Sequence, residues 1–221
     1  MFDSLFLILI SIFVPIIVFT GFKIFKCSNY QKFLNVLSIV LLALEILRFF
    51  YSTTFYTDAE TPKEDLKFGI ITILSIFSLF ATFNNSKIKD SLRSIFVLVS
   101  LSPIILGLFD PSVYINSLDV NGVCKAMFMV QCGLTLAIAL FYVLDNLKIN
   151  PLNILWSVIF ILIYVVINAL TIWYWKMNTE FNLLWYMSYL TVVISIAVMF
   201  TIYYIYKFLT NKKNKNKIEN K

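Results

Sequence analysis

The chain has 221 residues, of which 60% are hydrophobic and only 14% are charged, and its mean hydropathy is +0.86. A soluble domain carries roughly 25% charged residues, so this composition excludes a soluble globular protein. The net charge of +6 does not call for a nucleic-acid partner, because the basic C-terminal stretch NKKNKNKIENK is the kind of flexible end that anionic lipid headgroups attract. The same lysines could equally serve only to set the topology.

Seven apolar runs follow one another along the chain, and a helix of about 20 residues is enough to cross the hydrocarbon layer of a membrane. They cover residues 2–22, 33–56, 68–83, 94–109, 124–144, 152–175 and 182–207. The connections are brief, and no linker or heptad run marks a second domain. We therefore expect an all-α fold, a polytopic transmembrane bundle of seven helices over residues 1–208, followed by a disordered basic cytoplasmic tail over residues 209–221.

The first run resembles a signal peptide only in its apolarity. It has no basic segment before it and no A-x-A cleavage site, and Lys23 and Lys26 follow it directly. We expect it to be retained as a membrane span.

The distribution of basic residues predicts the orientation, because cytoplasmic loops carry the excess of Lys and Arg. Thirteen of the eighteen Lys and Arg residues fall on the side that holds the C-terminus, whereas the other side receives four lysines and most of the acids. Aromatic residues near the expected interfaces agree with this placement: Trp173, Tyr174, Trp175, Trp185 and Tyr186 outside, and Tyr203, Tyr204 and Tyr206 inside. We expect a multi-pass protein of the plasma membrane with its N-terminus outside.

The second run contains an acid and a base three positions apart, Glu45 and Arg48. Residues at this spacing share one helix face, and an unpaired charge at the bilayer centre costs at least about 2.5 to 3.5 kcal/mol. The pair is therefore expected to face protein or a water-filled cavity.

Other polar residues fall at a similar depth on other predicted helices. Counted from the outer ends at 1.5 Å per residue, Arg48 and four partners lie about 10 to 12 Å below the outer boundary, and Glu45 lies one turn deeper. The partners are Ser75, Gln131, Cys132 and Asn168. We predict that these residues line a pocket that opens outward and binds a membrane lipid or a small anionic ligand. The alternative is that they only join helices through hydrogen bonds, with the ion pair fixing their register.

No cofactor or metal is predicted. The chain has no histidine, which removes the commonest metal ligand and any histidine-based triad. Cys132 could act as a nucleophile with Glu45 as its base, but a thiol in apolar surroundings is inert, so we predict no catalytic residue. The segment 106–123, which contains Asp110 and Pro111, is the longest outer loop and is expected to act as a lid or as an ordinary connection.

Several stretches resemble the YwaF-like family of small bacterial integral membrane proteins, which look distantly similar to a vertebrate transmembrane acyltransferase acting on glycerophospholipids. The matching stretches are LLALEILRFF, IILGLFDPS, MFMVQCGLTLAIALFYVL and INPLNILWSVIFILIYVVINALTIWYWKMN, with Asn168 and Asn178. The family pattern has a His-x-Cys at the start of span three and a His-Gly in span five. Here the first region reads LKFGIITILS, and Cys132 stands where the second histidine would be. The resemblance thus implies the family's scaffold without its thiol and imidazole chemistry.

Four functional classes follow from these observations. The favoured one is a non-catalytic protein that binds a lipid or small molecule through Glu45 and Arg48. The alternatives are an acyltransferase-like lipid enzyme, the substrate-binding subunit of a membrane transporter, and a purely structural protein. The oligomeric state is left open.

Overall fold

The computed structural model describes residues 2–24, 29–55, 70–84, 88–109, 122–145, 147, 149–175, 193–194, 196–198 and 200–208. Every regular element within these ranges is an α-helix, so the all-α prediction is confirmed there. The helices are α1 (Phe2–Ile24), α2 (Tyr30–Phe55), α3 (Ile70–Phe83), α4 (Lys89–Val99), α5 (Ser102–Phe109), α6 (Val123–Leu144) and α7 (Pro151–Trp175). Residues 193–194, 196–198 and 200–208 are also helical.

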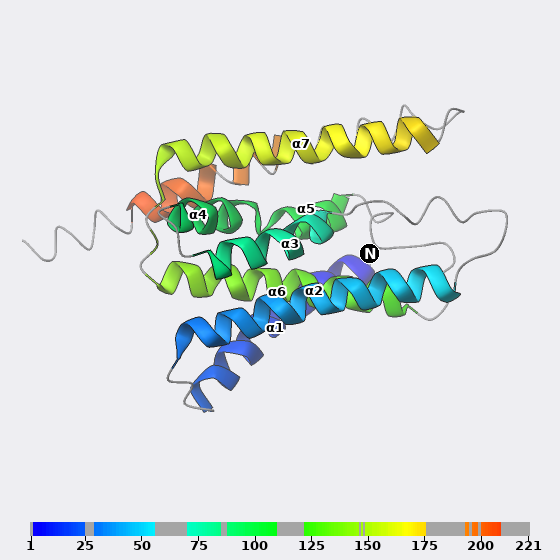
Figure 1. The fold of residues 1–221 in the computed structure, drawn as a ribbon, viewed down its shortest axis with the longest axis horizontal. Coiled ribbons are helices and arrows are strands. Elements are labelled where there is room, and N and C mark those ends of the chain that lie inside the picture. The colour runs from blue at the N-terminus through cyan, green and yellow to red at the C-terminus, as the bar shows by residue number, and fades with distance from the viewer. Residues whose placement is uncertain are drawn as a thin grey trace, which may run out of the picture.

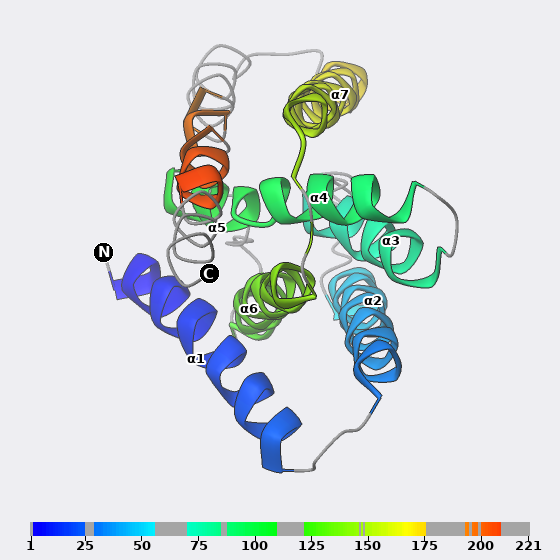
Figure 2. The ribbon, with the colours of Figure 1, turned by 90° about the vertical axis from the view of Figure 1, so that its left-hand side faces the viewer.

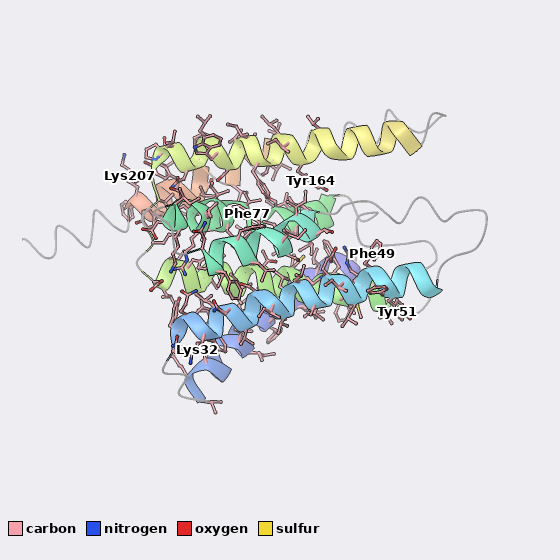
Figure 3. The ribbon with its side chains drawn as sticks, in the orientation of Figure 1. Lys32, Phe49, Tyr51, Phe77, Tyr164 and Lys207 are labelled. Carbon is pink, nitrogen blue, oxygen red and sulfur yellow. The ribbon has the colours of Figure 1, made fainter. Side chains whose placement is uncertain are left out.

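The helices lie roughly along one long axis and alternate in direction (Figure 1). The two short helices α4 and α5 follow one another in the same direction and together run the length of the bundle once. Viewed from one end, α6 lies in the middle, with α1 and α2 on two sides of it and α4 crossing above, while α7 stands at the edge (Figure 2). Only five or six residues separate α1 from α2, α3 from α4 and α6 from α7, so the chain reverses its direction within a few residues at each of these points. Lys32 and Lys207 lie at one end of the bundle, and Phe49 and Tyr51 lie toward the other (Figure 3).

The closest packing in the bundle joins α1 to α6, which run parallel. A Cβ atom at Gly133 would lie 2.5 Å from Cβ of Val14, so the two backbones approach as closely as they do only because position 133 is glycine. Further along the same pair, the rings of Phe19 and Phe141 stack with centroids 4.3 Å apart. The aromatic rings and the small residue together fix how α1 lies on α6.

The fourth predicted span, residues 94–109, is wrong as a single helix. The helix begins earlier, at Lys89, and breaks at Ser100 and Leu101 into α4 and α5. Pro103 has no N–H group to donate to the carbonyl one turn before it. The carbonyl of Val97 instead accepts hydrogen bonds from the backbone N–H and the hydroxyl of Ser100, at 3.4 and 2.7 Å, which closes the end of α4.

Three helical stretches are long and apolar enough to cross a membrane: Leu5–Ile24, Tyr30–Tyr51 and Val123–Leu144. Three more are apolar but shorter: Ile70–Phe83, Pro151–Tyr164 and Ile196–Phe208. Large apolar side chains stand exposed along α1, α2 and α7, a surface that fits lipid better than water.

Some predicted features lie outside the described residues. These are most of the segment 106–123, the tail 209–221, Asn178, the first part of the seventh span, and the aromatic side chains expected near its outer interface, including Trp173 and Trp185.

Candidate functional site

The candidate site begins with the ion pair on α2. Arg48 donates from Nε to Oε2 of Glu45 at 3.0 Å and from Nη2 to Oε1 at 2.8 Å, so the guanidinium holds the carboxylate at two points. One turn of helix separates the two residues, and leucine and isoleucine beside them keep the backbone helical. Glu45 is only 6% exposed, which means that α2 turns this face toward the interior of the bundle.

Two more helices supply donors to the same carboxylate. Thr72 of α3 donates its hydroxyl to Oε1 of Glu45, and Gln131 of α6 donates from Nε2 to Oε2 at 2.8 Å. Each carboxylate oxygen therefore accepts two hydrogen bonds. Such complete pairing is what a buried charge requires, and it joins α2, α3 and α6 at one point.

Two atoms of this centre keep unused hydrogen-bonding capacity. Nη1 of Arg48 has no hydrogen-bond partner within the described residues, and this side chain is 19% exposed, more than Glu45 beside it. Oε1 of Gln131 is buried and also has no partner within them. The centre can therefore offer N–H donors at its more exposed edge and one amide oxygen in its interior.

The other predicted site residues lie elsewhere. Ser75 is buried one turn along α3 from Thr72, and its hydroxyl donates to the carbonyl of Ile71 at 2.7 Å. Cys132 is 0% exposed and belongs to an apolar cluster with Leu7, Ile71, Phe128 and Met129. Asn168 belongs to α7, but its side chain lies outside those that the structure describes. The structure thus brings together Glu45, Arg48 and Gln131 out of the six.

The structure contains a second polar centre, around Arg93, that was not predicted from the sequence. Arg93, which falls in the connection between the predicted spans 68–83 and 94–109, lies in α4 and is 3% exposed. Its Nη1 donates to Oδ2 of Asp145 at 2.7 Å, its Nη2 donates to Oε1 of Gln31 at 2.8 Å, and the guanidinium carbon lies 4.8 Å from the centre of the Tyr142 ring. The assignment of Arg93 to a loop was therefore wrong, because partners on α2 and α6 satisfy its charge inside the bundle.

Three hydroxyl groups lie beside this second centre. Oγ of Ser38 and Oγ1 of Thr82 are 2.8 Å apart, and Thr82 also hydrogen-bonds the hydroxyl of Tyr142. The Tyr142 hydroxyl lies 3.5 Å from the carbonyl oxygen of Ser78. The only signal for this group in the sequence is the spacing of polar residues at three and four positions along each helix.

Within the described ranges, no three His, Cys, Asp or Glu side chains gather where they could hold a metal ion. The arrangement instead consists of two arginine and carboxylate pairs, each with one buried partner, Glu45 or Arg93, and with hydroxyl groups nearby. Comparisons of the chain with models of protein families, with curated proteins and with solved structures gave no match.

Proposed function

We propose that the chain is a multi-pass protein of the plasma membrane that binds an anionic group at Arg48 and performs no catalysis on it. The group would be a phosphate or carboxylate, carried either by a lipid headgroup or by a small molecule. We further propose the seven-span topology with the N-terminus outside, and a relationship to the YwaF-like family in which this chain keeps the scaffold alone.

The alternating helices and the exposed apolar side chains support the membrane topology. Lys32 and Lys207 lie at the same end of the bundle (Figure 3), and a shared basic end is typical of the cytoplasmic side.

The single observation that carries the binding proposal is the unused edge of the Arg48 guanidinium. Glu45 occupies Nε and one N–H of Nη2, so that, as far as the described residues go, Nη1 and the second N–H of Nη2 remain as a planar fork that matches two oxygens of a carboxylate or phosphate. Unpaired N–H donors in surroundings of low polarity cost free energy, and an anionic oxygen would remove that cost.

The neighbouring carboxylate does not prevent this binding. Thr72 and Gln131 also donate to Glu45, so its negative charge is spread over four hydrogen bonds and held on the Nε–Nη2 edge, beside the fork. Acyl transfer through Cys132 has no comparable support, because the thiol is enclosed by apolar side chains.

Native mass spectrometry and lipid analysis of the purified full chain test the proposal. Wild-type protein is compared with the double variant Glu45→Gln, Arg48→Gln, which removes both charges at nearly constant size. Thr72→Val is the matched control, since it alters the environment of Glu45 and leaves the guanidinium intact. We expect a bound anionic species that survives in Thr72→Val and is lost in the double variant.

A second experiment distinguishes the two possible sources of the anion, a free small molecule and a lipid headgroup. A thermal-shift series with inorganic phosphate and short carboxylates, in a zwitterionic detergent, reports a free small ligand, whereas co-purifying phospholipid reports a headgroup. Equal retention of every bound species by wild type and the double variant would exclude the proposal.

A further inference from the structure

The last turn of α1 and the first turn of α2 lie at the same corner of the bundle (Figures 1 and 2). Ring contacts join them, because the centroid of the Phe22 ring lies 5.9 Å from that of Tyr30 and 5.0 Å from that of Phe33. Lys23 follows Phe22 and Lys32 precedes Phe33 in the chain, so both lysines belong to this corner. We call these five residues together the basic corner.

The basic corner is attached to α6 as well. The ring of Phe141 lies between 5.3 and 5.4 Å from each of the three rings of the corner, again measured between centroids. The Tyr30 hydroxyl also donates a hydrogen bond to the carbonyl oxygen of Phe141. Aromatic pairs in such contact stabilise a fold beyond the area that they bury, so the backbone positions of Lys23 and Lys32 are fixed relative to three helices.

Both lysines of the corner are available to a partner outside the chain. Lys23 and Lys32 are exposed, and within the part of the chain that the structure describes neither ammonium group forms an ion pair. Arg48 and Arg93, by contrast, each hold a carboxylate. The first turn of α2 contains no acid, and neither does the last turn of α1. The corner therefore presents two positive charges to an anionic partner.

Each lysine stands at the end of a line of exposed apolar side chains on its own helix. The members follow one another at intervals of three, four or seven residues, which keeps them on one helix face. They are Phe13 and Ile16, before Lys23 on α1, and Val36, Ile39 and Val40, after Lys32 on α2. A lysine in such a place lays its methylene groups on the apolar surface and keeps its ammonium group at the edge. The corner thus joins positive charge to a surface that suits acyl chains.

The two apolar lines have the depth of one leaflet of a membrane. Phe13 lies ten residues before Lys23 and Val40 lies eight residues after Lys32, which is about 12 to 15 Å at 1.5 Å per residue. Half of a hydrocarbon core of about 30 Å has the same depth. A phospholipid whose acyl chains run along these lines would therefore have its headgroup at the level of the two lysines.

This combination of charge and apolar surface decides between the possible anionic partners. A free anion or an acidic protein would neutralise the lysines but would leave the apolar lines uncovered, whereas a phospholipid contacts both. A zwitterionic headgroup brings an ammonium group of its own, which the two lysines repel. The corner therefore favours a headgroup whose only charge is that of its phosphate.

We propose that the basic corner binds one anionic phospholipid, with the phosphate against Lys23 and Lys32 and the acyl chains along α1 and α2. The corner is separate from the site at Arg48. Lys32 lies at one end of the bundle, whereas Phe49, the neighbour of Arg48 in the chain, lies toward the other (Figure 3). Lipid binding at the corner therefore does not depend on anion binding at Arg48.

Native mass spectrometry of the purified full chain tests the proposal. The protein is reconstituted in nanodiscs with equal amounts of dioleoyl phosphatidylglycerol and dioleoyl phosphatidylcholine, which share their acyl chains and differ in headgroup charge. Wild-type protein is expected to retain mainly phosphatidylglycerol. A lysine near an anionic surface contributes about fivefold in affinity, so the double variant Lys23→Gln, Lys32→Gln should lower the ratio of the two bound lipids by about five- to thirtyfold.

Two matched controls show whether charge at the corner is responsible. Lys23→Arg, Lys32→Arg keeps both charges and should keep the wild-type ratio of bound lipids. Lys125→Gln removes a lysine at the opposite end of the bundle, because α6 begins near Lys125 and reaches the corner only at Phe141. This variant should also keep the wild-type ratio. Thermal unfolding followed by circular dichroism verifies that each variant is folded.

The double variant Glu45→Gln, Arg48→Gln separates the corner from the site at Arg48. It leaves both lysines intact, so the preference for phosphatidylglycerol should persist in it. A preference that is lost in this variant and kept in Lys23→Gln, Lys32→Gln would assign the lipid to Arg48 and overturn the proposal for the corner. Equal retention of the two lipids by wild-type protein would overturn it as well, as would displacement of the bound phosphatidylglycerol by millimolar inorganic phosphate.

Discussion

Nη1 of Arg93 lies 2.7 Å from Oδ2 of Asp145, and this ion pair joins α4 to the end of α6 across 52 residues of sequence. The two partners are buried unequally. The Arg93 side chain is 4% exposed, whereas that of Asp145 is 45% exposed, so replacing the arginine leaves the aspartate able to reach water.

Because Asp145 can reach water, Arg93→Leu should lower the free energy of unfolding by less than the loss of one partner of a fully buried ion pair does. Removing one partner of a fully buried ion pair costs about 3 to 5 kcal/mol. Here the main loss is the donor to Oε1 of partly buried Gln31, and we expect the free energy of unfolding to fall by about 1 to 3 kcal/mol. Unfolding in mixed detergent micelles, followed by circular dichroism, measures the change. Lys89→Ala on the same helix is the control, and a fall in Arg93→Leu no larger than in this control would contradict the prediction.

Replacing Arg48 by glutamine should be more costly, because the charge left behind is buried. Glu45 would keep only two neutral donors, Thr72 and Gln131, and we expect a loss of about 3 to 5 kcal/mol. The double variant Glu45→Gln, Arg48→Gln also removes the carboxylate charge that Arg48→Gln leaves buried and unpaired. Most of the free energy of unfolding lost in Arg48→Gln should therefore be recovered. The same measurement on Glu45→Gln alone completes the cycle, and a loss in the double variant equal to the sum of the two single losses would show that the pair is not coupled.

Gly133→Ala should loosen the contact between α1 and α6. The new Cβ would meet Val14 at 2.5 Å, and overpacking of this kind costs about 1 to 3 kcal/mol. Gly21→Ala is an internal control on α1, because nothing lies within 4 Å of a Cβ atom built there. That variant should be neutral or more stable by up to about 1 kcal/mol, the ordinary helical preference of alanine.

Adding Val14→Gly to Gly133→Ala removes the colliding atom and should restore part of the loss, whereas Val14→Ala keeps the Cβ atom and should not. Apparent melting temperatures of the purified variants would distinguish these outcomes. A Gly133→Ala variant as stable as Gly21→Ala would mean that the two helices separate without cost.

The thiol of Cys132 should resist alkylation in the folded protein. It is 0% exposed among apolar side chains, and a buried thiol forms little of the reactive thiolate. With Cys27 and Cys124 replaced by serine, the intact mass after treatment with N-ethylmaleimide reports this residue alone. We expect modification only after denaturation. Rapid modification of the native protein would reopen a catalytic role for Cys132.

Most of the features that could be predicted from sequence were contained within one helix. The predicted spans 2–22, 33–56 and 124–144 agree closely with α1, α2 and α6, since a long apolar run has few alternative structures. The pairing of Glu45 with Arg48 follows from their spacing, and counting depth along the helices identified Gln131 as a neighbour.

The features that were missed depend on contacts between distant segments. Nothing near Arg93 in the sequence identifies Gln31 and Asp145, its partners 62 and 52 residues away, and the lysines before it suggested a loop. The break at Ser100 is hidden in an apolar run, although Pro103 was an available signal. Thr72 was not singled out because a lone threonine in a predicted span is common and uninformative.

The parallel packing of α1 on α6 has a consequence for biogenesis. The chain between Val14 and Gly133 is 118 residues long, so α1 leaves the ribosome long before the surface that receives it has been made. In the proposed membrane topology, α1 must until then remain in the bilayer with Ser11, which is buried in the finished protein, facing fatty acyl chains. Leu5–Ile24 of α1 is the most apolar of the three long stretches. This apolarity suits a helix that is surrounded by lipid on all sides before α6 is synthesised.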